Sequence, residues 1–143
     1  MLLGTFAPKL DDKGRLVLPA KFWDEFSRGV VVTEGRDGCL YLYGQEEFET
    51  LYRRMSAQLD KLGQAGRDFI RRFLGGASQE VPDSQRRITI PPALREHAHL
   101  ERELTVIGTG THAEVWDTAT LAAYTAQRSE LSDADEEVIQ GLF

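Results

Sequence analysis

Two arginines in this sequence each follow an aspartate by four residues: Arg15 follows Asp11, and Arg87 follows Asp83. The guanidinium group is a planar, permanently charged fork that matches a phosphate or the edge of a guanine base. An aspartate at this spacing could hold such an arginine in position. For a single pair, an ion pair that only clamps a turn is the simpler interpretation. Two pairs with the same spacing favour a repeated cationic site for phosphates or bases.

Both pairs lie inside a longer repeat. Residues 11–22 read DDKGRLVLPAKF and residues 83–94 read DSQRRITIPPAL, so each copy has an acid, three residues, an arginine, three β-type residues and a proline. A glycine stands seven residues before each acid, at Gly4 and Gly76. This shared spacing indicates an internal duplication. A half-chain of about 70 residues buries little core alone, so we expect the two copies to fold on each other.

The repeat also predicts the elements that hold the arginines. The first copy reads as a β-hairpin whose turn carries Asp11, then a short helix after Pro19, then a second hairpin. The predicted ranges are 5–10 and 15–18 for the first hairpin, 20–26 for the helix, and 30–33 and 39–43 for the second hairpin. In the second copy, residues 91–97 take the place of the helix, and Leu104 aligns with Val31.

Helices are predicted between and after the two copies. Apolar residues at helical spacing from Phe48 to Leu62 predict a helix that stops at Gly63, and a second apolar face runs from Phe69 to Leu74. The expected segments are a first repeat at 5–47, a helical insert at 48–75, a second repeat at 76–119 and an acidic helical tail at 120–143.

Two N-terminal caps are predicted in the tail. Asp117 suits the N-cap of a helix, and Ser132 with Asp135 forms a capping-box pattern ahead of an apolar stripe over residues 138–143. An apolar stripe on an acidic tail needs a surface to pack against. That surface could belong to the same chain or to a neighbouring subunit.

The net charge of −6 is unevenly distributed. Residues 1–100 carry 15 Lys and Arg against 14 Asp and Glu, whereas residues 101–143 carry 2 against 9. A local basic surface on the repeats is therefore compatible with an acidic protein. No stretch approaches the ~20 apolar residues of a membrane span, and the N-terminus lacks the layout of a signal peptide. With one cysteine, Cys39, we expect a cytoplasmic protein without an internal disulfide.

Enzymatic and metal sites find little support. The chain has no phosphate-binding glycine loop followed by Lys and Ser or Thr, and the glycines of residues 108–110 are too few for a dinucleotide fingerprint. His97, His99 and His112 could suggest a metal site. On a helix, however, His97 and His99 would not share a face, because they are separated by two positions. Cys39 in an apolar strand reads as a buried, inert thiol. We therefore expect neither a metal, nor a cofactor, nor an enzyme.

Four stretches resemble the bacterial MraZ family: residues 10–19, 37–43, 67–69 and 83–91. The resemblance covers most of the chain and is weakest in the tail. It implies an α+β fold of two SpoVT-AbrB-type domains, combined in a swapped-hairpin β-barrel with accessory helices. It also implies ring-shaped homo-oligomers that bind direct repeats in promoter DNA, repress the division and cell-wall gene cluster that includes their own gene, and associate with the nucleoid.

The expected DNA-binding residues follow from the repeat and the resemblance together. Arg15 and Arg87 are the principal contacts, with Asp11 and Asp83 orienting them. Lys9, Lys13 and Arg86 are expected to add phosphate attraction.

One position departs from the family pattern. Family members commonly have glycine before the second arginine, as Gly14 stands before Arg15, but this chain has Arg86. We expect the second tip to be shaped differently or to be less rigid, because a side chain disfavours positive φ.

An antitoxin-like or protein-interaction module of the same barrel type is the alternative function.

Overall fold

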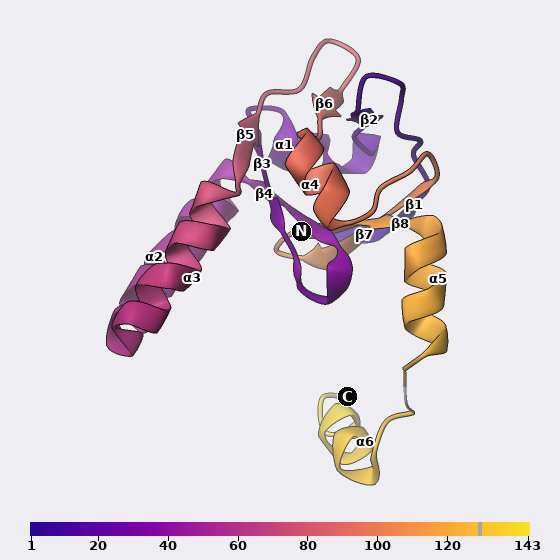
Figure 1. Cartoon of the computed structure of the whole chain (residues 1–143). Coiled ribbons are helices and arrows are strands. Elements are labelled where there is room, and N and C mark those ends of the chain that lie inside the picture. Colours follow the sequence, from indigo (N-terminus) through magenta and orange to yellow (C-terminus); the bar gives the residue numbers. More distant parts are fainter. Residues whose placement is uncertain (129) are drawn as a thin grey trace.

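The computed structural model describes residues 1–128 and 130–143 and shows a mixed α+β fold (Figure 1). The strands are β1 (Leu2–Phe6), β2 (Arg15–Val17), β3 (Val30–Glu34), β4 (Leu40–Gly44), β5 (Ser78–Glu80), β6 (Arg87–Thr89), β7 (Leu104–Gly110) and β8 (Ala113–Asp117). The helices are α1 (Trp23–Phe26), α2 (Gln45–Leu59), α3 (Gln64–Gly75), α4 (Pro92–His97), α5 (Thr118–Ala126) and α6 (Asp133–Gln140).

Six strands form one antiparallel sheet in the order β1-β7-β8-β4-β3-β5, and β2 pairs with β6 in a separate two-stranded ladder. β1 from the first copy pairs with β7 of the second copy, while β5 from the second copy pairs with β3 of the first. Each copy thus gives its first strand to the other. This exchange confirms the predicted duplication and its swapped arrangement. Among the described residues the six-stranded sheet ends at β1 and β5, so its pairings do not close a ring.

The prediction of a local hairpin from residues 5–10 and 15–18 is wrong. β1 and β2 do not pair with each other; β2 pairs with β6, its equivalent in the other copy. Between β1 and β2, the tight turn is closed by the amide of Asp11, which donates to the carbonyl of Arg15 at 2.8 Å. A strand, a turn and a strand have the same sequence signature whichever strand the second one joins.

Two pairings mark a pseudo-twofold axis through the molecule. Tyr41 in β4 lies opposite Glu114 in β8, and Leu16 in β2 lies opposite Ile88 in β6. In both pairs the partners occupy equivalent positions in the two copies. The axis therefore passes through the middle of the ladder and relates the two turns that precede β2 and β6.

The alignment of Leu104 with Val31 is off by one residue. Leu104 pairs with the last residue of β8, as Val30 pairs with the last residue of β4. The loop enclosed by the last pair of β7 and β8 holds four residues, 109–112, whereas the loop between β3 and β4 holds five, 35–39. Because the loop of the second hairpin is one residue shorter, Leu104 is equivalent to Val30 and not to Val31.

The core joins equivalent apolar residues of both copies. Its paired positions include Leu16 with Ile88, Leu18 with Ile90, Phe22 with Leu94, Val30 with Leu104 and Val32 with Val106. Cys39 is fully buried, as predicted, and burial raises the pKa of its thiol to about 12. Such a thiol stays protonated and unreactive at neutral pH.

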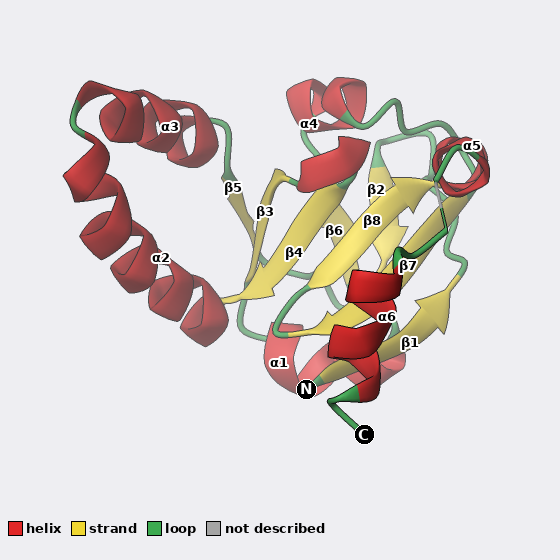
Figure 2. Cartoon of the chain, turned by 90° about the horizontal axis from the view of Figure 1, so that it is seen from below, coloured by secondary structure: helices red, strands yellow, loops and turns green. Residues whose placement is uncertain are grey.

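The helices lie around the sheet, and α2 and α3 are set apart from the others (Figure 2). α2 and α3 form an arm that projects from the β3 and β5 side, while α5 packs on β7 and β8.

The cap predictions for α5 and α6 are confirmed: Asp117 accepts a hydrogen bond from the amide of Thr120, and Ser132 and Asp135 form a capping box. No helix within the described residues has the length and apolarity needed to span a membrane.

Candidate nucleic-acid interface

The turn before β2 is built around the Asp11 carboxylate. Its Oδ1 accepts hydrogen bonds from the amides of Lys13 and Arg15, both at 2.9 Å, and its Oδ2 accepts one from Nε of Arg15 at 2.8 Å. The Gly14 amide closes the turn by donating to the carbonyl of Asp11 at 3.0 Å. Asp11 thus fixes both the backbone of the turn and the side chain of Arg15.

The turn before β6 repeats this geometry. Asp83 accepts from the amides of Gln85 and Arg87 at 2.9 and 2.8 Å, and from Nε of Arg87 at 2.7 Å. The Arg86 amide donates to the Asp83 carbonyl at 3.0 Å, as the Gly14 amide does in the first turn. The two turns are therefore built from the same set of hydrogen bonds.

The expectation that Arg86 reshapes the second turn is wrong. Arg86 has φ of 61° and Gly14 has φ of 74°, so both occupy the left-handed region. The hydrogen bonds of Asp83 and the β2–β6 ladder hold Arg86 in a conformation that costs a non-glycine residue roughly 1–2 kcal/mol. The shape of the turn is retained, and the cost appears as backbone strain at Arg86.

The β2–β6 ladder places both arginines on one face. Arg15 lies opposite Thr89 and Arg87 lies opposite Val17, so Arg15 and Arg87 are diagonal neighbours. Diagonal neighbours of this kind are about 7–8 Å apart. Alternate residues of a strand point to opposite faces, and Leu16 between them is buried. The face that carries the arginines is consequently the outward one.

Both guanidinium groups keep their outer nitrogens available. In the described part of the chain, the hydrogen bonds of these side chains to aspartate use Nε alone. The side chains of Arg15 and Arg87 are 26% and 28% exposed. Each arginine can therefore offer its two terminal nitrogens to a ligand while the aspartate holds its near side.

The two aspartates are charged at neutral pH. The amide of Arg15 donates to Asp11 and lowers the pKa of its carboxyl, assisted by the Arg15 side chain and the Lys13 amide and opposed by burial. The Asp83 pKa is lowered in the same way by Arg87 and Gln85. Both carboxylates thus remain acceptors for the arginines across the physiological range.

Arg95 is a third arginine at the first turn, and the sequence reasoning missed it. Its Nε donates to the carbonyl of Ile90 at 2.9 Å, and its guanidinium covers Gly14. A Cβ at position 14 would lie 2.8 Å from Cζ of Arg95. Glycine there meets both the positive φ and this close approach. The repeat gives no signal for Arg95, because the equivalent position in the first copy is Trp23.

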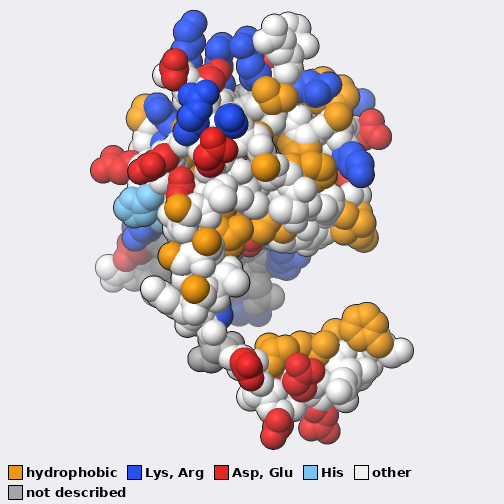
Figure 3. All heavy atoms as spheres, turned by 90° about the vertical axis from the view of Figure 1, so that its right-hand side faces the viewer, with side chains coloured by type: hydrophobic (Ala, Val, Ile, Leu, Met, Phe, Trp, Pro, Cys, Tyr) orange, Lys and Arg blue, Asp and Glu red, His pale blue; other side chains and the backbone are white. Residues whose placement is uncertain are grey.

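The other predicted cations are spread around this end of the molecule. Lys13 and Arg86 are exposed, one on each turn. Lys9 lies at a β-bridge with Glu103, and its Nζ is 3.7 Å from the Glu103 carboxylate, so its charge is partly offset. Figure 3 shows Lys and Arg side chains gathered at the end of the molecule that carries the ladder.

His112 lies apart from His97 and His99, which lie at the end of α4. His112 stacks on Tyr43 with ring centroids 4.9 Å apart, and burial lowers its pKa. Nδ1 of His97 is 3.5 Å from the Glu34 carboxylate, and His99 follows α4. Within residues 1–128 and 130–143, no group of three or more His, Cys, Asp or Glu side chains could hold a metal ion.

Comparison with known protein families matches both halves of the chain to one family. The family model described as "MraZ protein, putative antitoxin-like" matches residues 1–70 and again residues 73–141. The chain belongs to the MraZ family. Each matched segment contains one Asp-Arg pair, so the family match and the internal repeat coincide.

Curated relatives of the MraZ family match over the whole chain. One from Leifsonia xyli subsp. xyli (strain CTCB07) is 49% identical over 144 residues, and one from Clavibacter michiganensis subsp. michiganensis (strain NCPPB 382) is 54% identical over 144 residues. A third, from Kocuria rhizophila, is 52% identical over 145 residues. In all three, the alignment covers 100% of both proteins. Each is named transcriptional regulator MraZ.

Proposed function

We propose that this protein is a transcriptional regulator that binds specific DNA sequences through the outward face of the β2–β6 ladder. The observation that carries the proposal is the pair of congruent turns, each presenting an arginine held by an aspartate. The names of the MraZ relatives support the same class of function. A regulator of this kind needs neither a cofactor nor a catalytic site.

The dimensions of DNA suit this surface. The major groove, about 12 Å wide, admits a two-stranded β-ribbon. In that groove Arg15 and Arg87 would donate their terminal nitrogens to guanine O6 and N7 or to phosphates. Lys13 and Arg86, at the two outer turns, would add phosphate contacts that position the ladder without reading sequence.

The finer features of the proposal rest on the family resemblance. The protein would act in the cytoplasm on the nucleoid, as a homo-oligomeric ring that binds direct repeats upstream of its own gene and represses the division and cell-wall gene cluster. A single ladder offers few contacts and binds weakly alone. Several ladders on one ring, engaging several repeats, would supply the useful affinity.

The test is binding of the purified protein to DNA from upstream of its own gene, against scrambled DNA, at two salt concentrations. We expect Arg15→Ala with Arg87→Ala to weaken specific binding by at least about 30-fold, because each bidentate base contact contributes about 1–3 kcal/mol. The salt dependence should also become shallower, because fewer counterions are released. The matched control, Arg28→Ala with Arg128→Ala, removes two exposed arginines away from the ladder and should bind like the wild type.

Retention of specific binding by the folded Arg15 and Arg87 double variant would place the DNA site elsewhere. Equally weak binding of the wild type to both DNAs would favour the alternative, an antitoxin-like or protein-interaction module. In that case, capture of a protein partner should be insensitive to salt.

A further inference from the structure

α6 carries an apolar face that no described part of the chain covers. Val138, Ile139 and Leu142 share one side of the helix by their spacing, and they are 69%, 37% and 76% exposed. Phe143 follows and is fully exposed. In Figure 3 the hydrophobic side chains run along one side of this C-terminal segment and the acidic ones lie on the other. A face of this kind on a short helix indicates a docking partner.

The α2–α3 arm has the same property. No side chain of α2 is buried, and Gly66 is the one buried residue of α3. Phe69, Phe73 and Phe48 form a row of stacked rings, with centroids 5.7 and 6.5 Å apart. Phe69 at the end of this row is 38% exposed. The arm therefore presents an aromatic surface as well as many exposed charged side chains.

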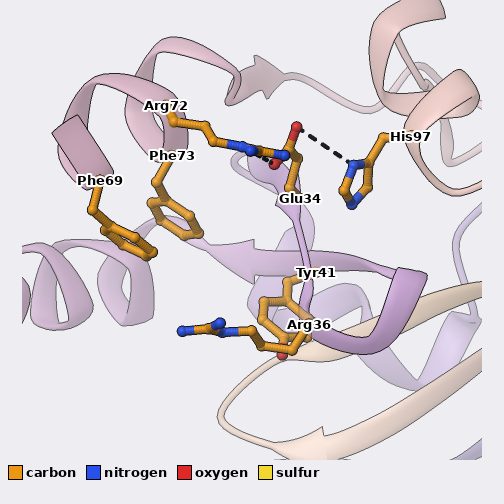
Figure 4. Close-up of a pocket in the computed structure, with 8 residues that line it drawn as sticks. Glu34, Arg36, Tyr41, Phe69, Arg72, Phe73 and His97 are labelled. Carbon is orange, nitrogen blue, oxygen red and sulfur yellow. Dashed lines mark hydrogen bonds and ion pairs between the residues drawn. The ribbon is translucent and has the colours of Figure 1, made fainter.

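Phe69 and Phe73 form one wall of a cavity of about 380 Å³ between α3 and the β3–β4 hairpin (Figure 4). The Tyr41 ring lies on the side of the hairpin. Aromatic walls of this kind accept aliphatic or aromatic side chains. The volume is sufficient for one or two large apolar side chains from a docking helix.

The charges around this cavity are mainly cationic. Nε of Arg72 is 3.2 Å from the Glu34 carboxylate, which also faces His97. Arg36 lines the cavity and makes no ion pair within the described residues. Nε2 of His97 is buried without a hydrogen-bond partner there. The cavity thus combines an apolar wall with the Arg36 guanidinium, which remains open to an acidic ligand.

The charges of the two surfaces are complementary. Residues 130–143 contain five Asp and Glu and no Lys or Arg, whereas α3 contains three Arg against one Asp, and Arg36 and Arg72 line the cavity with Glu34. Opposite charges around apolar contacts favour association and fix its orientation. α5, which precedes α6, packs on β7 and β8, while the arm adjoins β3 and β4 at the other side of the sheet. Contact with another copy is therefore the arrangement that these positions favour.

We propose that α6 of one copy docks, apolar face first, into the cavity between α3 and the β3–β4 hairpin of a second copy. Each copy gives one helix and receives one, so the contact is head-to-tail. Contacts of this type close into rings when the rotation between neighbours allows it. This inference rests on the proposed homo-oligomer and names the surface that builds it.

The first test changes the apolar face of α6 by one charge. Val138→Asp should raise the dissociation constant of the oligomer at least about tenfold, measured by sedimentation velocity across a concentration series. The control Gln140→Asp adds the same charge two residues away, outside the apolar face, and should assemble like the wild type. Neither residue contacts the core, and circular dichroism of both variants verifies the fold. Equal assembly of the two variants would overturn the proposal.

The second test identifies the partner surface by disulfide formation. One chain carries Ala134→Cys in α6, one turn before Val138 on the apolar side of the helix, and a second, differently tagged chain carries Ala65→Cys, one turn before Phe69 on the same side of α3. We expect a disulfide between the two chains, and little when Arg67→Cys on the other side of α3 replaces Ala65→Cys. A disulfide confined within a chain that carries both Ala134→Cys and Ala65→Cys would show docking in cis and overturn the proposal.

These outcomes separate this inference from the proposed function. An oligomer that survives Val138→Asp leaves DNA-binding regulation intact and removes only the α6 interface. A wild-type protein that is monomeric at all concentrations removes the interface and the ring together. Binding of the ladder to DNA is read independently, through the Arg15 and Arg87 variants.

Discussion

At the scale of single residues, Arg86 shows how the fold imposes a conformation on an unfavourable residue. Replacing Arg86 by glycine should relieve the strain of its left-handed backbone, about 1–2 kcal/mol, against about 0.4–1 kcal/mol of added freedom in the unfolded chain. We therefore expect Arg86→Gly to raise the free energy of unfolding by up to roughly 1.5 kcal/mol. Chemical denaturation of the two proteins measures this difference.

Arg86→Lys is the control for that experiment, because it keeps both the charge and the strain. It should unfold at the same denaturant concentration as the wild type. A loss of stability in Arg86→Gly would mean that the Arg86 side chain makes a stabilising contact in solution that outweighs its backbone strain.

The two aspartates predict a specific pH dependence of stability. Their pKa values are lowered in the folded protein, so the stability they contribute is fully present above their ordinary value of 3.8 and is lost as pH falls through the lowered values. The difference in unfolding free energy between the wild type and the Asp11→Asn, Asp83→Asn double variant should be constant from pH 7 to about pH 5.

Below pH 3.8 that difference should shrink, because a protonated aspartic acid resembles the asparagine that replaces it. Denaturation series at pH 7, 5 and 3 measure it. A difference that is as large at pH 3 as at pH 7 would show that the asparagines act through something other than lost charge.

At the scale of elements, the sequence predicts what is local and misses what depends on a distant partner. The caps at Asp117 and Ser132 were predictable because a cap involves residues three apart on the chain. The strands around Arg15 and Arg87 were predictable from β-type residues and turns. The partner of β2 was not, because the same pattern fits a local hairpin and a ladder between copies.

The pairing of β1 with β7 is a contact between distant segments that the sequence pattern does not reveal. Gly4 lies opposite Gly108, and a Cβ at Gly108 would lie 2.6 Å from the backbone of Leu2. Glycine at position 108 therefore permits a close approach between two strands about a hundred residues apart in the chain. In the sequence this glycine reads only as part of an incomplete dinucleotide fingerprint. Arg95 escaped prediction for a related reason, since its role depends on how α4 lies over Gly14.

At the scale of the whole molecule, the candidate DNA surface and the candidate assembly surfaces are separate. The ladder occupies one end, the arm projects to one side, and α6 lies beyond α5 away from the ladder (Figure 1). The distribution of charge follows this division, with the acidic excess in residues 101–143. The acidic residues of α6 lie away from the ladder and leave its arginines attractive to DNA.

This separation predicts that assembly changes avidity without changing the binding of one ladder. Given both proposals, the wild type should bind DNA with two correctly spaced repeats at least about 100-fold more tightly than DNA with one, because the second contact becomes intramolecular. Val138→Asp should lose most of that ratio and still bind a single repeat like the wild type. Fluorescence anisotropy with one-repeat and two-repeat duplexes, at protein concentrations below assembly of the variant, measures both quantities.

Gln140→Asp should keep the full ratio, since it adds the same charge to α6 off the apolar face. If Val138→Asp instead weakened binding to one repeat, the added charge would be acting on the ladder itself, and the two surfaces would not be independent. If Val138→Asp kept the tighter binding to two-repeat DNA, a contact other than α6 would be holding the ladders together. A ring built through α6 therefore predicts a change in the ratio, which neither a misfolded ladder nor a general loss of DNA affinity would produce.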